Sequence, residues 1–192
     1  MTVFDVESAE RAIGYVFSDK ALLELAFTHS TIAHERKREF PQSNERLEFL
    51  GDAVIQFIIS EKLYEQYGGA EGELTELRKL FVSQFAQAAA VRKHKLWDFM
   101  LCANVNIEEL KEKKYADPFE SVAGAVYLDA RNATGDKVAG FAAAQKFIFS
   151  MLDEVVVEVD KKAAENAKIA EGMYMLCAKD NSISIIRQGA QD

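Results

Sequence analysis

Residues Asn44–Val54 read NERLEFLGDAV, and they place three carboxylates in a segment whose other positions are typical of a buried helix. Glu48 and Asp52 are four residues apart, and Glu45 precedes Glu48 by three. A helix aligns residues at these spacings along a single stripe. Ionised carboxylates are costly to bury without partners, so an acidic stripe on an otherwise apolar helix predicts a functional site.

Two residues in the middle of this stretch are poor helix formers. Gly51 costs about 1 kcal/mol relative to alanine in a helix interior. We therefore expect it to allow the close approach of another helix or of a substrate backbone. Asp52 lies within an apolar run, where an unpaired carboxylate would be costly to bury, so we expect it to have a functional partner.

A second acidic motif follows in residues 114–128, which read KYADPFESVAGAVYL. Asp117 and Glu120 are three residues apart where an apolar run begins. If the helices that carry the two motifs pack together, their carboxylates converge on one point. Only a bound cation could stabilise such a cluster away from water.

The start of the second motif also has a purely structural interpretation. Asp117, Pro118 and Glu120 have the form of a helix start, with aspartate as N-cap, proline at the first position and glutamate at the third. Taken alone, capping is the better explanation. Both roles can coexist if Asp117 lies near the helix start with its side chain turned toward a metal.

The candidate ligands indicate which cation would bind. All of them are carboxylates, with no histidine or cysteine in either motif, and hard oxygen ligands select Mg²⁺ or Mn²⁺ over Zn²⁺ or copper. Mg²⁺ keeps several waters, which leaves positions for phosphate oxygens and for a nucleophilic water whose pKa the metal lowers. Phosphodiester hydrolysis is the chemistry that this arrangement favours.

Four segments together resemble one known family. Residues 44–54 resemble the signature of the ribonuclease III family, and residues 115–129 resemble that family's second acidic motif. Residues 12–30, which include AIGYVF and LLELAFTHS, are similar to its opening helices, and residues 71–78, EGELTELR, to the segment after the signature helix. The match covers roughly residues 8–150 in the family's order, which makes coincidence far less plausible than for one short motif.

This resemblance implies a homodimeric enzyme that uses Mg²⁺, for which Mn²⁺ substitutes, to cut both strands of double-stranded RNA. Four residues fall on the catalytic positions that hold the metal and activate water, namely Glu48, Asp52, Asp117 and Glu120. Glu45 and Glu71 fall on accessory acidic positions of the cleavage site. Phe49 matches the aromatic residue that plugs into the partner subunit at the dimer interface.

Composition and periodicity predict an all-α helical bundle, and the resemblance implies that this bundle is ribonuclease III-like. The 192 residues are 49% hydrophobic and 28% charged, which suffices for one well-cored domain. Only two prolines interrupt long runs of helical period, and no stretch alternates convincingly over the length of a strand. The runs predict helices near 6–15, 19–30, 44–67, 73–96, 118–131, 135–158 and 160–178.

The same runs predict the division of the chain. We place a ribonuclease III nuclease domain at residues 1–158 and a C-terminal helix with a polar tail at residues 159–192. That tail is too short for the separate double-stranded-RNA-binding domain common in the family, so either this lineage lacks the domain or the chain is a fragment. Without that domain, RNA affinity should be weak and strongly salt-dependent. Aromatic residues at bundle-like spacings are expected in the core, namely Phe27, Phe57, Phe81, Phe85 and Trp97. His29 is expected to be a buried hydrogen-bonding residue.

A net charge of −8 argues, on its own, against a nucleic-acid partner. Bound metal would offset much of this charge, since the two motifs contribute five of the acidic residues. Basic residues cluster near the motifs, and the expected RNA contacts are Arg36, Lys37, Arg38, Lys113 and Lys114. Charge runs are more often solvated faces, so this expectation depends on the family resemblance.

Cysteine usage and hydropathy predict the compartment. Cys102 and Cys177 lack metal-ligand spacing, and the N-terminus lacks the basic region and apolar core of a secretory leader. No run approaches the roughly 20 apolar residues that span a bilayer. We expect an intracellular protein without a membrane partner, cytoplasmic or, in a eukaryote, nuclear.

Two alternative functions remain open beside the endoribonuclease. A catalytically weak or inactive RNA-binding relative would keep the fold, and loss of an acidic ligand would be its sign in the sequence. An all-α, Mg²⁺-dependent nucleotide pyrophosphohydrolase also uses paired acidic motifs, but it would cleave nucleoside triphosphates. The complete set of four carboxylates disfavours the first, and Phe49 with the order of the segments disfavours the second.

Overall fold

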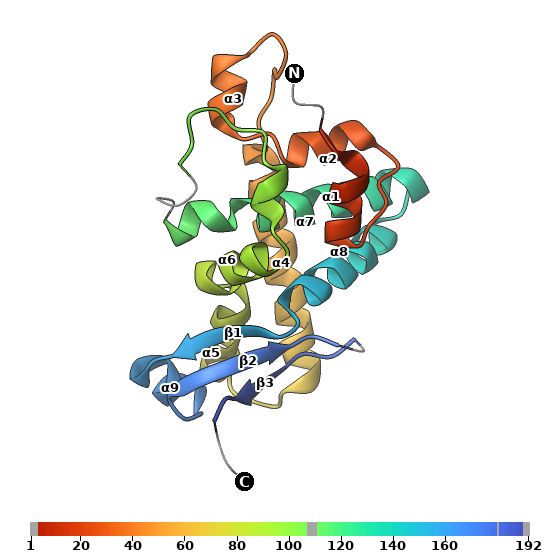
Figure 1. Cartoon of the computed structure of the whole chain (residues 1–192). Coiled ribbons are helices and arrows are strands. Elements are labelled where there is room, and N and C mark those ends of the chain that lie inside the picture. The colour runs from red at the N-terminus through yellow and green to blue at the C-terminus, as the bar shows by residue number, and fades with distance from the viewer. Residues whose placement is uncertain (1–3, 107–110, 180, 190–192) are drawn as a thin grey trace.

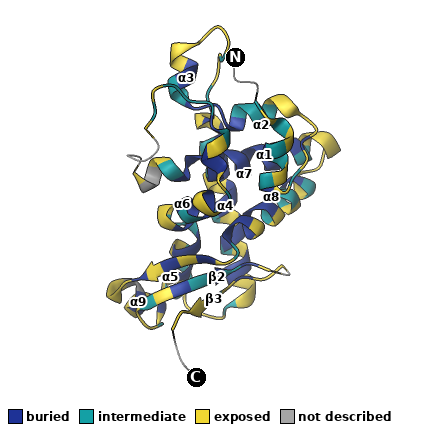
Figure 2. Ribbon diagram, in the orientation of Figure 1, coloured by how far each residue is buried: buried dark blue, intermediate teal, exposed yellow. Residues whose placement is uncertain are grey.

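The computed structural model describes residues 4–106, 111–179 and 181–189, and it shows a helical bundle with a small sheet at one end (Figure 1). Two long helices form the centre, α4 (Glu45–Gln66) and α7 (Glu112–Thr134). The surrounding helices are α1 (Val6–Ile13), α2 (Lys20–Ala26), α3 (Ser30–Glu35), α5 (Glu71–Val82), α6 (Gln84–Lys93), η1 (Leu96–Phe99) and α8 (Lys137–Leu152). The chain then forms β1 (Val155–Val159), α9 (Lys161–Ala167), β2 (Gly172–Cys177) and β3 (Ser184–Arg187). Buried residues concentrate along α4, α7 and α8 (Figure 2).

The two central helices touch backbone to backbone. A Cβ atom built on Gly51 of α4 would lie 1.8 Å from the carbonyl oxygen of Glu120 in α7. A Cβ atom on Gly124 of α7 would lie 2.5 Å from the carbonyl oxygen of Leu47. Any side chain would force the helices apart, so the expected role of Gly51 in close helix approach is confirmed. The contact brings the first acidic motif against the second.

A buried carboxylate ties α7 to the N-terminal helices. Asp129 is only 2% exposed and accepts hydrogen bonds from the Tyr15 hydroxyl at 2.9 Å and the backbone N–H of Ser18 at 2.9 Å. It also accepts one from the backbone N–H of Asp19 at 2.8 Å. Asp19 in turn caps α2, so one side chain fixes the turn between α1 and α2.

We expect Asp129→Asn to lower the free energy of unfolding by about 2 kcal/mol, because an amide cannot accept all three hydrogen bonds and turns a donor toward one of the N–H groups. Tyr15→Phe removes a single donor and should cost about 1 kcal/mol. Urea denaturation followed by far-UV circular dichroism measures both values. Equal stability of Asp129→Asn and the unmodified chain would show that the hydrogen bonds of this carboxylate do not stabilise the fold.

The all-α prediction is wrong in the C-terminal part of the chain, where β1, β2 and β3 form an antiparallel sheet in that order. Val155 pairs with Leu176, and Tyr174 pairs with Arg187. The helix expected over 135–158 ends at Leu152, and the one expected over 160–178 is replaced by α9 and β2. Residues 155–159, VVVEV, alternate between buried and exposed, and branched side chains favour a strand.

Other expected helices are shorter than predicted because local capping interrupts them. The helix expected over 73–96 divides at Ser83, whose extended backbone ends α5 and whose hydroxyl accepts from the Ala86 N–H at 3.1 Å. The helix expected over 19–30 divides at His29, which caps α3 through Nδ1. His29 is therefore a buried hydrogen-bonding residue, as expected. None of the described helices is long and apolar enough to cross a membrane.

The predicted capping role of Asp117 is also wrong. Helix α7 begins at Glu112, so Asp117 lies inside it and Pro118 follows within the helix. Proline has no N–H to donate and is usually excluded from helix interiors, so it is easily taken as a helix start. The extra turn places Asp117 on a buried face, where it is available to the neighbouring α4.

Candidate functional site

The acidic residues of the first motif lie near the start of α4. Glu45 and Asp52 are exposed, whereas Glu48 is half-buried against α7. The start of α4 is held by the Asn44 N–H, which donates to the carbonyl oxygen of Thr28 at 2.8 Å. Asp52 is exposed to solvent, so it is not a buried carboxylate that requires a partner. It lies next to Gly51, where the two helices are closest.

The second pair of carboxylates comes from α7. Asp117 is buried and Glu120 is half-buried. The carbonyl of Glu120 lies against Gly51, which is one residue from Asp52 and three from Glu48. The backbone contact therefore sets the separation between the acidic residues of the two helices.

Electrostatics show which carboxylates act on one another. The pKa of Glu48 is raised to about 8, chiefly by burial and next by the negative charge of Asp117. Glu120 and Glu45 act in the same direction, while the ammonium of Lys114 opposes them. We call Glu45, Glu48, Asp117 and Glu120 the acidic cluster. A carboxyl group held this far above its usual pKa marks a place where a cation would be stabilising.

The acidic cluster fits a hard divalent cation by the chemistry of its donors, which are all carboxylate oxygens. Within the described residues, no three acidic, histidine or cysteine side chains are already arranged as ligands of one metal ion. The charges of the other three carboxylates raise the pKa of Glu48, but the side chains would have to rotate to share an ion. Glu48, Asp117 and Glu120, with the exposed Asp52, are the residues that could hold it.

Glu71 does not join the acidic cluster within one chain. It begins α5 and accepts a hydrogen bond from the Thr75 hydroxyl at 3.1 Å. Helix α5 follows the C-terminal end of α4, which is roughly 27 Å along the helix axis from Glu48.

The expected RNA-contacting residues divide into two groups. Arg36, Lys37 and Arg38 are exposed after α3, where Arg36 pairs with Glu39 at 2.7 Å. Lys114 lies at the acidic cluster, with its Nζ 3.1 Å from Oδ2 of Asp117. The side chain of Lys113, the remaining candidate, lies outside the described residues.

Two residues near the acidic cluster were not predicted as part of it. Burial lowers the pKa of His29, Lys114 lowers it further, and the charges of Asp117 and Glu45 oppose both, so the imidazole is close enough to the cluster to respond to its charges. Arg92 stacks over the ring of Tyr115 at 4.3 Å. The basic run 92–95 was the only sign of Arg92 in the sequence, and no sequence signal linked His29 to the acidic residues.

Exposed aromatic side chains lie along α4. Phe49 is 82% exposed, Tyr64 is almost as exposed, and Phe57 is half-exposed although it contacts the ring of Phe141 at 5.1 Å. The prediction that Phe57 and Phe85 belong to the core is therefore wrong, since Phe85 is 70% exposed. Helical period alone does not distinguish a face that packs within the chain from one that packs against another molecule.

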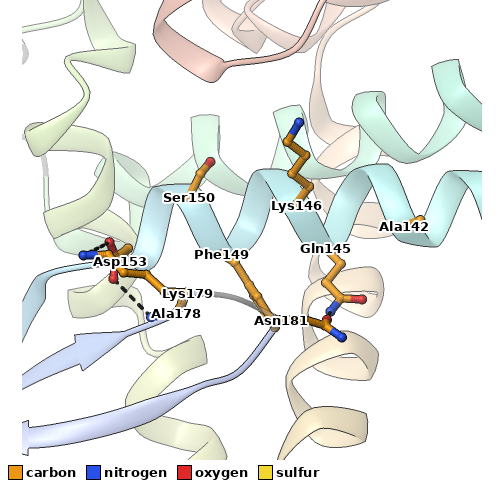
Figure 3. Close-up of a pocket in the computed structure, with 9 residues that line it drawn as sticks. All are labelled: Ala142, Gln145, Lys146, Phe149, Ser150, Asp153, Ala178, Lys179 and Asn181. Atoms are coloured by element: carbon orange, nitrogen blue, oxygen red, sulfur yellow. Dashed lines mark hydrogen bonds and ion pairs between the residues drawn. The ribbon is translucent and has the colours of Figure 1, made fainter.

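One cavity lies away from the acidic cluster. It has a volume of about 600 Å³ and lies between α8 and the segment joining β2 to β3 (Figure 3). Phe149 forms part of its wall, the Gln145 amide donates a hydrogen bond to Oδ1 of Asn181, and Lys179 pairs with Asp153 at 3.1 Å. None of the candidate site residues lines this cavity, whereas Glu71 lines another, of about 560 Å³. The exposed Glu45 and Asp52 leave the first acidic motif open to solvent, which suits a large substrate.

Comparison with known proteins identifies the family. Residues 45–131 match the family model described as "Ribonuclease III domain". Ribonuclease 3 of Listeria welshimeri is 36% identical over 172 residues, which cover 81% of this chain and 69% of that protein. Ribonuclease 3 of Fusobacterium nucleatum is 37% identical over 124 residues, which cover 62% of this chain and 53% of that protein. The chain thus spans between about half and two thirds of the length of these curated relatives.

Solved structures agree with the sequence comparison. The nuclease domain of ribonuclease III from Campylobacter jejuni, described for structural flexibility in a region involved in dimer formation, aligns with a TM-score of 0.65 and 29% identity. That alignment covers 86% of this chain and the whole of the Campylobacter chain. A second structure of the same domain aligns with a TM-score of 0.64 and 30% identity, over 78% of this chain and 95% of that one. The chain therefore belongs to the ribonuclease III family.

Proposed function

We propose that the chain is a double-stranded-RNA-specific endoribonuclease that hydrolyses phosphodiesters on both strands of a duplex with Mg²⁺, or with Mn²⁺ in its place. The observation that carries the proposal is the acidic cluster. Carboxylates from two sequence motifs about 65 residues apart are brought together by the backbone contact at Gly51, and they shift the pKa of Glu48. The family of the chain supplies the reaction class.

We assign the metal ligands residue by residue. Glu48 and Asp52 on α4, with Asp117 and Glu120 on α7, would hold the ion, and Glu45 would remain an outer acidic residue. The ion supplies a lowered pKa to its bound water and offsets charge on the phosphodiester. Asp52 is exposed beside the helix contact, so its side chain is free of surrounding packing and can rotate toward the ion. The buried Asp117 is the most fixed of the four, which suits an anchoring ligand.

We propose that two copies form the working enzyme, with the exposed aromatic residues of α4 at the interface. Apolar side chains as exposed as Phe49 and Tyr64 are uncommon on a surface that stays in water. The Campylobacter relative has a region involved in dimer formation. A dimer would also provide the only route by which Glu71 reaches an acidic cluster, that of the partner subunit.

Phe49→Ala is expected to weaken the dimer about a hundredfold, because a large aromatic anchor at an interface contributes about 2 kcal/mol or more. Sedimentation equilibrium at micromolar concentrations measures the change. Phe85→Ala is the matched control, since it removes an equally large and similarly exposed ring from α6. If both variants dimerise as strongly as the unmodified chain, or if that chain is a monomer, the proposed interface is wrong.

The experiment that tests the activity uses a labelled RNA duplex, its single strand and a nucleoside triphosphate, each at low salt with Mg²⁺ and with EDTA. Cutting confined to the duplex and abolished by EDTA is the expected result. RNA binding without cutting would support the inactive relative instead, and hydrolysis of the triphosphate would support the pyrophosphohydrolase. Exposed Lys37 and Arg38 would contact phosphates, so cutting should weaken as salt rises.

A further inference from the structure

The acidic cluster contains a cation of its own. The Nζ atom of Lys114 lies 3.1 Å from Oδ2 of Asp117, one turn further along α7. The aspartate side chain is 8% exposed and the lysine side chain 53% exposed. The ammonium thus approaches a buried carboxylate from the solvent side. Charge-assisted bonds of this kind are stronger than neutral hydrogen bonds, and the low exposure of Asp117 limits competition from water.

Lys114 acts on more than its direct partner. Burial alone would lower the pKa of Lys114, but the hydrogen bond and charge of Asp117 raise it, with further contributions from Glu48 and Glu45. Conversely, Lys114 is the cation that lowers the pKa of Glu48. A single ammonium therefore partly balances the charge of several carboxylates on two helices.

We propose that Lys114 competes with the divalent cation for Asp117 and so sets the metal affinity of the site. The inference rests on the proposed function, because it assumes that Asp117 is a metal ligand. An ion bound to Asp117 must either displace the ammonium from Oδ2 or take the other oxygen beside a positive charge. The first arrangement loses the attraction between Lys114 and Asp117, and the second adds repulsion between the ammonium and the metal ion. Removal of the ammonium should therefore strengthen metal binding.

The competition also orders the steps of binding. Lysine has a compact charge on a flexible four-carbon stem, so its head can leave Asp117 without a change in the helix. The displaced ammonium of Lys114 would then be available to a phosphate at the same place. Metal loading and the contact of Lys114 with RNA are consequently linked, and the lysine serves the substrate only after the metal has taken its carboxylate.

The test is calorimetric titration of the full chain with Mg²⁺ in the absence of RNA. It is made at pH 9.5, well above the pKa of about 8 of Glu48 and below the raised pKa of Lys114, so that competition by the ammonium is separated from competition by protons. Lys114→Met is expected to lower the Kd for Mg²⁺ about tenfold, whereas Lys114→Arg, which keeps the charge, should leave it within about twofold. Lys111→Met is the matched control, since it removes the same charge from an exposed position just before α7.

Each outcome decides one part of the inference. If Lys114→Met binds Mg²⁺ no more tightly than Lys111→Met, or more weakly than the unmodified chain, the competition is wrong while the metal site stands. If the unmodified chain binds no Mg²⁺, the metal site itself is wrong and the competition with it. Thermal unfolding followed by circular dichroism confirms that each variant is folded, which the exposure of both lysines leads us to expect.

Discussion

Replacing Glu120 by glutamine is expected to lower the rate of duplex cleavage about 10²–10⁴-fold, because loss of one metal ligand removes several kcal/mol of charge stabilisation in the transition state. The amide has nearly the same volume as the carboxyl group, and Glu120 is only half-buried, so the fold should not change. The substitution also removes a charge that raises the pKa of Glu48. The lower pKa of Glu48 would by itself favour Mg²⁺, but the loss of one charged ligand should outweigh it, so weaker Mg²⁺ binding should accompany the slower reaction.

Single-turnover cleavage of a labelled duplex, measured over a range of Mg²⁺ concentrations, checks this prediction. Glu158→Gln is the matched control, since it makes the same chemical change on the outward face of β1, away from the acidic cluster. It should cut at the rate of the unmodified chain. A Glu120→Gln protein that retains more than about a tenth of that rate would remove Glu120 from the set of ligands, since a ligand should contribute more than 1.4 kcal/mol.

The central part of the fold could be predicted from the sequence because periodicity and acidic spacing agree there. Gly51 was expected to allow close helix approach, and Gly124 of the second motif meets α4 in the same way. The juxtaposition of Glu48 with Asp117 and Glu120 then follows from helix geometry. The exposure of Asp52 could not be predicted, because the sequence pattern around an aspartate in an apolar run is the same whether the side chain is buried or exposed to solvent.

The sheet in the C-terminal region could not be predicted because the local sequence pattern there does not mark where the helix ends and the strands begin. Helix α8 ends at Leu152 and the next apolar residues, Val155–Val159, continue its hydrophobic run without a glycine or proline. The chain turns at Glu154, which adopts a positive φ of 58° that a non-glycine residue seldom shows. The sheet also depends on partners distant in sequence, such as Ile183, whose N–H donates to Oε1 of Gln66 at 2.9 Å. Local pattern carries no information about such contacts.

Gly51→Ala is expected to lower the free energy of unfolding by more than about 3 kcal/mol, at or beyond the upper end of the cost of overpacking a core. The new methyl group would lie 1.8 Å from the Glu120 carbonyl oxygen and 2.7 Å from its carbon. Both are backbone atoms of a long helix, so no side-chain rotation relieves the clash, and α4 and α7 must separate. The gain of about 1 kcal/mol from alanine in a helix offsets only part of this cost.

Urea denaturation of Gly51→Ala and Gly72→Ala separates packing from helix propensity. Gly72 lies in the first turn of α5, where a Cβ atom meets nothing within 4 Å, so its replacement should be neutral or stabilising by up to about 1 kcal/mol. Equal effects of the two substitutions would mean that α4 and α7 do not touch through their backbones. If they do touch, separating them moves Glu48 away from Asp117 and Glu120. Any Gly51→Ala protein that remains folded should then bind Mg²⁺ less tightly than Gly72→Ala, which connects the tightest packing contact of the fold to its proposed chemistry.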